Sequence, residues 1–344
     1  MDIAPNPITV SGTLLAQMFV YLDELKVDVD ALLRSLDVDL ATVKSPDAYI
    51  PIETYLTIQD EAAVSVNDPS FGLHLGEFAE PGSWSILGYM LMNCKNLGEG
   101  FEKSQRYSRI IGNLINARTE PHSKTVKLIF FTSPDAPEMS RHCFDTVFSG
   151  LVRMMRNFTG MEIHPLEVTF TYPEPNSRSE YERIFQCPIL FNQRDNSFTV
   201  DASVVNTPIL LANPNLLEYF EKYAESFLAE IDRKSEHSRT VTKIILSRLD
   251  DETLSITKVA QEMAVSVRTL QKRLEDEGVV FSDLYKDIRQ RLAQKYLREN
   301  YTVEQITYLL GFSEPSVFRK AFKKWSGVTP REYREQAFAA RTRI

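Results

Sequence analysis

The last third of the chain contains an internal repeat with a period of about 48 residues. In its first copy, apolar residues recur over 256–263 at the i, i+3, i+4 and i+7 spacing of one helical face. A short turn at 264–266 leads into a second helix, which carries Leu270 and Leu274 inward and ends near Gly278. This pattern predicts two short helices joined by a tight turn.

The second copy repeats these elements in the same order. An apolar stripe at 303–310 is followed by a turn at 311–313, and the next helix places Phe318 and Phe322 where the first copy has its two leucines. Gly327 repeats the glycine cap. A short helix, a short turn and a second amphipathic helix are the elements of a helix-turn-helix motif. We therefore predict an all-α C-terminal domain with two such motifs.

Helix-start signals support the second copy. Thr302 and Gln305 have the spacing of a capping box, and so do Thr329 and Glu332. Pro330 stands at the first position of a last helix, where its missing N–H costs nothing. These signals place the start of two helices independently of the apolar periodicity.

One helix of about 18 residues is expected between the two motifs, at 281–298. At 1.5 Å per residue it is roughly 27 Å long. A rigid spacer of that length can hold two reading helices about one turn of DNA apart, roughly 34 Å.

The outward faces of the two second helices carry side chains suited to DNA. Arg and Lys can pair with guanine and Gln with adenine in the major groove, and further basic residues can hold phosphates. The candidate DNA-binding residues are Arg268, Gln271 and Lys272 in the first motif and Ser316, Arg319, Lys320 and Lys323 in the second. A helical bundle with a solvated basic face is the alternative interpretation of this pattern.

Two segments of this region are similar to the AraC/XylS family of bacterial transcription regulators. They are SITKVAQEMAVSVRTLQKRLEDEG, which resembles the family's first motif, and TVEQITYLLGFSEPSVFRKAFKKWSGVTPREYR, which resembles its signature. The resemblance covers about residues 240–335. It implies that both second helices read bases, through the six matching positions Arg268, Gln271, Lys272, Ser316, Arg319 and Lys320. Some relatives carry Trp where this chain has Arg268, so no operator sequence is implied.

The first 235 residues mix helical and strand patterns without a regular alternation, which predicts an α+β domain. Helices are expected at 14–25, 29–36, 52–63, 97–118, 139–158 and 215–231, and strands at 126–132, 166–172 and 197–200. The polar stretch 232–239 has no apolar period and is the candidate linker. We expect domains at 1–235 and 236–344.

The N-terminal region resembles the sensor domain of one subset of the same family, the regulators of arginine and ornithine utilisation and of quorum sensing or virulence. The resemblance spans roughly residues 15–205 and is carried by GLHLG at 72–76, PGSWSILGY at 81–89, LGEGF at 97–101, Tyr107 and FQCPILF at 185–191. It implies an effector-binding and dimerisation domain, and not the double-stranded β-barrel of the sugar-sensing relatives.

Six residues are candidates for an effector pocket. They are the aromatic residues Trp84, Tyr89, Tyr107 and Phe148, which can line a ligand, and Arg109 and Arg153, which can meet a carboxylate. Core packing is the alternative role for the aromatic residues, and surface ion pairing for the arginines.

The charge of the chain is unevenly distributed. The whole chain has 39 Lys and Arg against 47 Asp and Glu, whereas residues 236–344 have 20 against 15. An acidic body joined to a basic end favours nucleic acid as a partner of that end only.

Several classes of protein find no support in the sequence. No apolar run of membrane-spanning length and no signal peptide occur, which favours a cytoplasmic location without membrane contact. Cys94, Cys143 and Cys187 are odd in number and widely spaced, so they frame no disulfide scaffold. The glycine spacing at 72–76 lacks the Lys-Ser/Thr end of a phosphate loop. We expect no metal, no cofactor and no catalytic residue.

The sequence therefore predicts a DNA-binding transcription regulator under the control of a small-molecule effector. The expected partners are double-stranded DNA and the effector. Activation is the usual role in the resembled family, and it implies RNA polymerase as a third partner. Paired operator half-sites are compatible with a homodimer. An enzyme with a DNA-binding tail and an architectural DNA protein without a ligand are the alternatives.

Overall fold

The computed structural model divides the chain into two compact units, one from Pro7 to Leu228 and one from Ala229 onward. The structure describes residues 8–36, 38, 43, 48–133, 136, 137, 139–234, 236–277 and 279–335, with 232–234 described by their backbone alone. Each unit has its own apolar core. Within the described part of the chain, none of the helices combines the length and apolar character that a membrane span requires.

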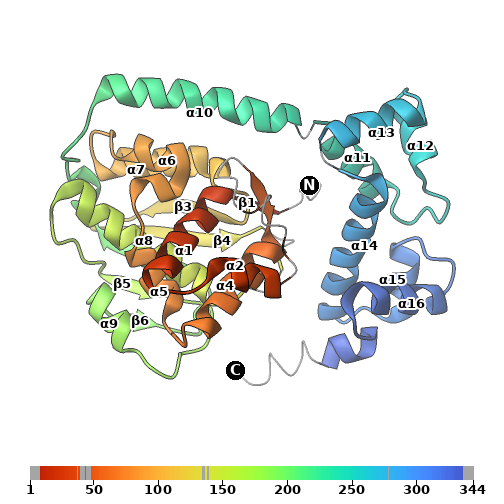
Figure 1. Ribbon diagram of the computed structural model, residues 1–344, viewed down its shortest axis with the longest axis horizontal. Helices are drawn as coiled ribbons and strands as arrows, with labels where there is room; N and C mark the ends of the chain where they lie inside the picture. Colours follow the sequence, from red (N-terminus) through yellow and green to blue (C-terminus); the bar gives the residue numbers. More distant parts are fainter. Residues whose placement is uncertain are drawn as a thin grey trace. The chain divides into compact units, whose positions relative to one another are not determined.

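The N-terminal unit is built mainly from helices around one sheet (Figure 1). Its helices are α1 (Gly12–Glu24), α2 (Val29–Ser35), α4 (Ile52–Ser65), α5 (Phe71–Glu77), α6 (Ser85–Leu91), α7 (Leu97–Tyr107), α8 (His142–Thr159), α9 (Ser179–Phe185) and α10 (Pro214–Lys234), with short 3-10 turns η1 (Pro81–Trp84), η2 (Ser108–Ile110) and η3 (Val204–Asn206).

The main sheet has five strands in the order β3-β4-β7-β5-β6. Their bounds are β3 (Ile115–Pro121), β4 (Thr125–Thr132), β5 (Glu167–Thr169), β6 (Ile189–Leu190) and β7 (Asn196–Asp201). All neighbours pair antiparallel except β5 and β6. A separate antiparallel pair joins β1 (Thr9–Ser11) to β2 (Tyr49–Pro51). The predicted α+β class is confirmed, with an open sheet in place of a barrel among the residues described.

The predicted helix over 97–118 is wrong in its second half. The helix α7 ends at Tyr107, and residues 115–121 form strand β3, which pairs with β4 along its whole length. Gly112 breaks the helical pattern because its φ of 151° lies far outside the helical region. Ile110 and Leu114 are buried as their periodicity indicated, but through a 3-10 turn and a loop.

The candidate linker is largely helical. Helix α10 continues to Lys234 and α11 begins at Glu236, while Ser235 lies outside the described residues. The polar composition of 232–239 therefore does not mark a long break in the chain's secondary structure.

Helix α8 packs on the sheet through one aromatic side chain. Phe148 is fully buried, and its ring centroid lies 5.0 Å from that of Phe130 on β4, 5.1 Å from Phe170 and 6.2 Å from Phe198 on β7. Aromatic rings at these separations contribute about 0.5–1.5 kcal/mol per pair beyond the area they bury. Phe148 is thus a core residue that joins α8 to the sheet.

The opposite side of α8 is held against α5 at backbone distance. A Cβ atom at Gly72 would lie 2.5 Å from the carbonyl oxygen of His142, and a Cβ atom at Gly76 would lie 2.8 Å from the amide nitrogen of Gly150 and closer still to Ser149 Oγ. Only glycine permits so close an approach. Gly72 and Gly76, whose spacing does not fit a phosphate loop, therefore form a helix-packing surface.

One carboxyl group lies inside this core. Asp145 on α8 is completely buried and accepts hydrogen bonds from the hydroxyl groups of Tyr172 and Tyr181, the latter at 3.0 Å from both carboxylate oxygens. Burial raises the pKa of Asp145 to about 7, although the two tyrosine hydrogen bonds and the charge of Arg141 act in the opposite direction. The two tyrosines satisfy the carboxyl group and so make its burial tolerable.

The C-terminal unit is entirely helical where it is described. It contains α11 (Glu236–Ser247), α12 (Ile256–Glu262), α13 (Val267–Asp276), α14 (Phe281–Arg298), α15 (Val303–Leu309) and α16 (Pro315–Ser326), followed by a helical turn that reaches Glu335. Helix α14 has the predicted bounds, with α12 and α13 at one end and α15 and α16 at the other (Figure 1).

We predict that Gly76→Ala destabilises the N-terminal unit by about 1–3 kcal/mol, because the new Cβ forces α5 and α8 apart. The matched control is Gly100→Ala inside α7, where a Cβ atom meets nothing within 4 Å. That change should stabilise by roughly 0.5–1 kcal/mol, the usual cost of glycine in a helix. Denaturant unfolding followed by Trp84 fluorescence in a Trp325→Phe chain measures both. Equal effects of the two substitutions would contradict the close-packing assignment.

Candidate nucleic-acid interface and interior cavity

The first repeated motif turns at Ala264. This residue has a φ of 55°, in the left-handed region, and lies between α12 and α13. The amide of Val265 donates to the carbonyl oxygen of Ala260 at 2.9 Å and closes the turn. Leu270 and Leu274 of α13 are buried in the core of the unit, as predicted.

The second motif repeats this geometry at equivalent positions. Gly311 has a φ of 61°, and the amide of Phe312 donates to the carbonyl oxygen of Thr307 at 2.9 Å. A Cβ atom at Gly311 would lie 2.6 Å from the carbonyl oxygen of Leu249, so the second turn excludes the alanine that the first accepts. Phe318 and Phe322 are fully buried. The predicted duplication is therefore confirmed in backbone conformation as well as in side-chain burial.

The predicted helix starts are confirmed by their hydrogen bonds. Thr302 and Gln305 form a reciprocal capping box, with bonds of 2.8 and 3.2 Å. Thr329 and Glu332 exchange equivalent bonds of 2.7 and 3.2 Å. Gly327 adopts the left-handed cap at the end of α16, whereas the cap expected at Gly278 falls outside the described residues.

The side chains predicted to contact DNA lie on the solvent side of α13 and α16. All seven are exposed: Arg268, Gln271, Lys272, Ser316, Arg319, Lys320 and Lys323. Two of them have acidic neighbours in the protein, since Arg319 lies 3.6 Å from Glu304 and the Ser316 hydroxyl donates to Glu314 at 3.1 Å. A DNA phosphate would compete with these two carboxylates for the same groups. The assignment of individual base contacts stays a prediction.

Arg289 connects the spacer helix α14 to the second motif. Sequence analysis did not detect this connection. The guanidinium carbon of Arg289 lies 4.3 Å from the ring centroid of Tyr285 and 4.2 Å from that of Phe312, and Nη2 donates to the carbonyl oxygen of Gly311 at 2.6 Å. Burial lowers the pKa of Arg289. The planar cation between two rings fixes the turn of the second motif to α14.

We predict that Arg289→Met destabilises the C-terminal unit by about 1–3 kcal/mol, because it leaves the Gly311 carbonyl without its donor and removes both ring contacts. Arg289→Lys should restore only part of the loss, since an ammonium group lacks the planar fork. The ring centroids of Trp325 and Phe312 lie 5.9 Å apart, so the fluorescence of Trp325 reports on this region. Its fluorescence during denaturant unfolding of a Trp84→Phe chain is the measurement. The control Lys286→Met, at an exposed position of α14, should change little; an equal loss there would rule out a special role for Arg289.

The N-terminal unit contains a partly open cavity of about 230 Å³. Side chains of α1, α6, α7, α8 and the strands β3 and β4 line it. Of the six residues predicted to form an effector pocket, all of which the structure describes, Trp84 is the one that lines this cavity. Sequence analysis missed the other lining residues because they are ordinary apolar residues spread over some 200 positions.

The remaining predicted aromatic residues lie elsewhere. Tyr89 is exposed, and its ring lies 6.4 Å from that of Phe220, while Phe148 belongs to the core between α8 and the sheet. Tyr107 is buried and its hydroxyl donates to Glu225 at 3.3 Å, and burial raises its pKa to about 12. The structure thus brings none of these three to the cavity.

The two predicted arginines also lie outside the cavity lining. Arg153 is exposed on α8, where its Nη2 atom lies 3.4 Å from a carboxylate oxygen of Glu80. Arg109 lies in the 3-10 turn η2, and its charge opposes the rise that burial produces in the pKa of Tyr49. The alternative of surface ion pairing describes Arg153.

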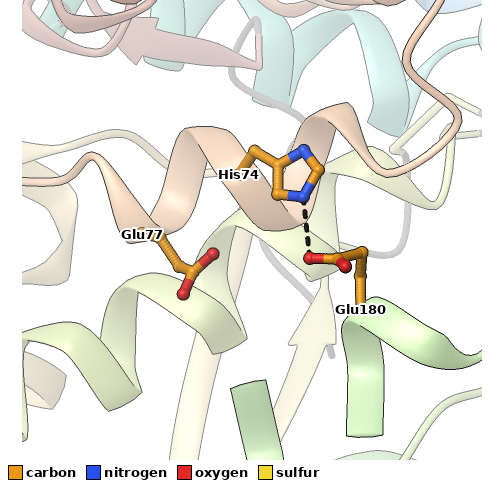
Figure 2. A group of neighbouring side chains, drawn as sticks. All are labelled: His74, Glu77 and Glu180. Atoms are coloured by element: carbon orange, nitrogen blue, oxygen red, sulfur yellow. Dashed lines mark hydrogen bonds and ion pairs between the residues drawn. The ribbon is translucent and has the colours of Figure 1, made fainter. Parts of the chain in front are cut away.

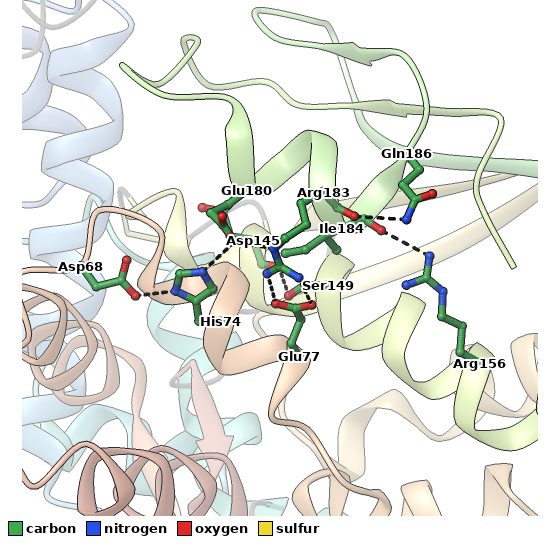
Figure 3. A network of polar contacts seen from close by, with 10 residues as sticks. All are labelled: Asp68, His74, Glu77, Asp145, Ser149, Arg156, Glu180, Arg183, Ile184 and Gln186. Carbon is green, nitrogen blue, oxygen red and sulfur yellow. Dashed lines mark hydrogen bonds and ion pairs between the residues drawn. The ribbon is translucent and has the colours of Figure 1, made fainter. Parts of the chain in front are cut away.

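A polar cluster joins α5 to α9 at a distance of 106 positions in sequence (Figures 2 and 3). His74 Nδ1 lies 2.6 Å from a carboxylate oxygen of Asp68, and its Nε2 lies 3.0 Å from a carboxylate oxygen of Glu180. Possible ligand atoms of His74, Glu77 and Glu180 lie within 4.8 Å of one another. However, Arg183 donates to both Glu77 and Glu180, so the two carboxylates already share one cation.

Protonation of His74 fits this ion-pair interpretation. Burial alone would lower its pKa, but the hydrogen bonds and charges of Glu180 and Asp68 outweigh burial and raise it. The cluster is therefore an ion-pair network that joins α5 to α9, and we assign no metal site to it.

Comparisons with known proteins agree with this architecture. Residues 27–209 match the family pattern described as the arabinose-binding N-terminal domain of AraC transcription regulators, and residues 259–336 match a helix-turn-helix domain. The chain is 26% identical over 313 residues to the ornithine utilization regulator of Pseudomonas aeruginosa, covering 91% of this chain and 92% of the relative. It is 25% identical over 315 residues to the HTH-type transcriptional regulator VirS of Mycobacterium tuberculosis, covering 90% and 92%.

Among solved structures, the transcriptional regulator CdpR from Pseudomonas aeruginosa aligns with a TM-score of 0.42 and 22% identity over 89% of this chain and 96% of that one. The two curated relatives are transcription regulators and not enzymes. The first family pattern covers more than half of the chain, and the second falls on the duplicated motif. The chain therefore belongs to the AraC family of DNA-binding transcription regulators.

Proposed function

We propose that this protein is a transcription activator in which a small-molecule effector, bound by residues 1–235, controls promoter binding by residues 236–344. The observation that carries the proposal is the duplicated motif: α13 and α16 bury equivalent positions and expose equivalent positions, which hold Arg, Gln and Lys in α13 and Ser, Arg and Lys in α16. Two reading helices on one chain suit two successive major grooves. The cavity in the N-terminal unit supports the ligand-binding part of the proposal.

We infer different roles for the exposed residues of the two helices. Arg268, Gln271 and Arg319 have the side chains that form bidentate contacts with base edges. Lys272, Lys320 and Lys323 supply point charges that suit phosphates, and Ser316 can bind either group. The acidic partners of Arg319 and Ser316 would hold these side chains in place until DNA binds.

We predict that purified full-length protein selects, from random duplexes at near-physiological salt, one motif with two blocks about ten base pairs apart. On that duplex Gln271→Ala or Arg319→Ala should cost about 1–3 kcal/mol of binding free energy and relax preference at one position. The control is Gln261→Ala, an exposed glutamine on α12, which should bind as the parent does. Equal losses on every duplex would assign Gln271 and Arg319 to phosphates, and an unselected pool would contradict sequence reading.

Activation requires RNA polymerase as a further partner, and paired half-sites favour a homodimer. We predict more transcript when the protein is added to purified RNA polymerase and a promoter that carries the selected motif. Fewer transcripts would assign repression instead. An architectural protein without an effector, the remaining alternative, predicts that no small molecule changes either DNA affinity or melting temperature.

A further inference from the structure

The chemistry of the cavity restricts the ligand that it can hold. Its wall is formed almost entirely by aliphatic and aromatic side chains, among them Leu87 on α6, Phe101 on α7, Phe130 on β4 and Met155 on α8. Its volume of about 230 Å³ lies somewhat below the roughly 300–1,000 Å³ of most ligand pockets. A ligand for this cavity is therefore small and predominantly apolar.

No charged side chain belongs to the wall. Among the described residues that line the cavity there is no Asp, Glu, Lys, Arg or His. An ionised carboxylate moved from water into such an environment loses its hydration without gaining a counter-charge, which costs far more than the burial of a neutral polar group.

Three hydroxyl groups in the wall have already used their hydrogens. The hydroxyl groups of Ser104, Ser108 and Thr146 donate to the backbone carbonyl oxygens of the residues three or four positions earlier, at 2.8, 3.3 and 2.8 Å. A hydroxyl group has one hydrogen, so each of these three presents only lone pairs to the cavity. Lone pairs repel an anion but accept a hydrogen bond from a neutral donor.

The Gln105 amide and the Cys143 thiol of the wall are committed in the same way, whereas Gln17 uses one of its two hydrogens. Gln105 Nε2 donates to the Phe101 carbonyl oxygen at 3.1 Å and to Thr119 Oγ1 at 2.6 Å, which uses both of its hydrogens. Gln17 Nε2 donates to the Leu75 carbonyl oxygen at 3.0 Å. The Cys143 thiol donates to Gln59 Oε1 at 3.1 Å. The wall thus combines apolar surface with the lone pairs of three hydroxyl groups and with the neutral N–H groups of Gln17, Trp84 and Asn116, and none of these groups supplies a counter-charge to an anion.

We propose that the cavity binds an uncharged, predominantly apolar small molecule with a hydrogen-bond donor, such as a medium-chain alcohol, and rejects the carboxylate of the same chain length. This inference rests on the proposed effector control and names the chemical class of the effector. It replaces the expectation that Arg109 and Arg153 meet a carboxylate, since neither lines the cavity.

Gly100 offers a way to fill the cavity without disturbing the fold. It lines the cavity from α7, and a Cβ atom added there meets nothing within 4 Å. A leucine side chain at this position would occupy space that the ligand needs. Glu102 on the same helix is exposed, so Glu102→Leu adds the same side chain outside the cavity and serves as the matched control.

The test is equilibrium binding of 1-octanol and of octanoate at about pH 7.5 to the full-length Trp325→Phe chain, followed by the fluorescence of Trp84 in the cavity wall. We expect a saturable change with octanol and a binding at least about tenfold weaker for octanoate, which is ionised at this pH. Across Gly100, Gly100→Ala and Gly100→Leu, the affinity for octanol should fall as the side chain grows, while Glu102→Leu should bind as the parent does.

Three results would overturn the proposal. Octanoate binding as tightly as octanol would show that the cavity does not select neutral ligands. No saturable signal with octanol, or the same affinity in Gly100→Leu and Glu102→Leu chains, would show that octanol does not occupy the cavity. The series through Gly100→Ala, which is expected to stabilise the helix, keeps the test decisive if Gly100→Leu fails to fold.

Binding of the same samples to the selected duplex separates this inference from the proposed function. Saturation by octanol without any change in DNA affinity would confirm the ligand class and refute effector control through this cavity. Sequence-specific DNA binding without octanol binding would leave the DNA-reading function intact and refute the ligand class alone.

Discussion

The N-terminal unit depends on the close approach of α5 and α8. With Gly72 and Gly76 facing the backbone of α8, the two helices meet at a distance that any side chain would prevent. This contact fixes one side of α8, and Phe148 fixes the other side against three aromatic rings of the sheet region. A helix held on both sides gives a fixed wall to the cavity, to which it contributes Thr146, Val147 and Leu151. The glycine pair therefore supports the cavity without lining it.

The two helix-turn-helix motifs have the same backbone but different supports. In both, a left-handed residue makes the turn, yet Ala264 is sufficient in the first while Gly311 is required in the second by the carbonyl of Leu249. Arg289 also binds the second turn to the spacer helix. Its guanidinium group donates a hydrogen bond to the Gly311 carbonyl oxygen and lies over the ring of Phe312. Since the orientation of a helix in the major groove determines which base edges it can reach, the proposed reading of DNA by α16 would depend on this attachment.

The C-terminal unit was predictable because its signals are local. The capping partners Thr302 and Gln305 lie three positions apart, and the apolar stripes repeat within one or two helical turns, so the sequence contains the whole pattern. The N-terminal unit was less predictable because its decisive contacts are remote. The apolar periodicity continued a helix through Gly112, where the backbone leaves the helical conformation. The spacing of Gly72 and Gly76 excluded a phosphate loop but did not reveal that the two glycines pack against α8. The pairing of His74 with Glu180 leaves no trace in the sequence between them.

Control of DNA binding by an apolar ligand needs only a modest energy difference. A ligand shifts an equilibrium between two protein states only through its different affinity for them. A tenfold change in DNA affinity corresponds to about 1.4 kcal/mol, and each buried methylene contributes about 0.8 kcal/mol. Two methylene groups buried in one state and exposed in the other are therefore enough. A cavity whose wall is apolar nearly throughout can supply this energy difference without any charged contact, because the difference depends on how many carbon atoms of the ligand are buried in each state.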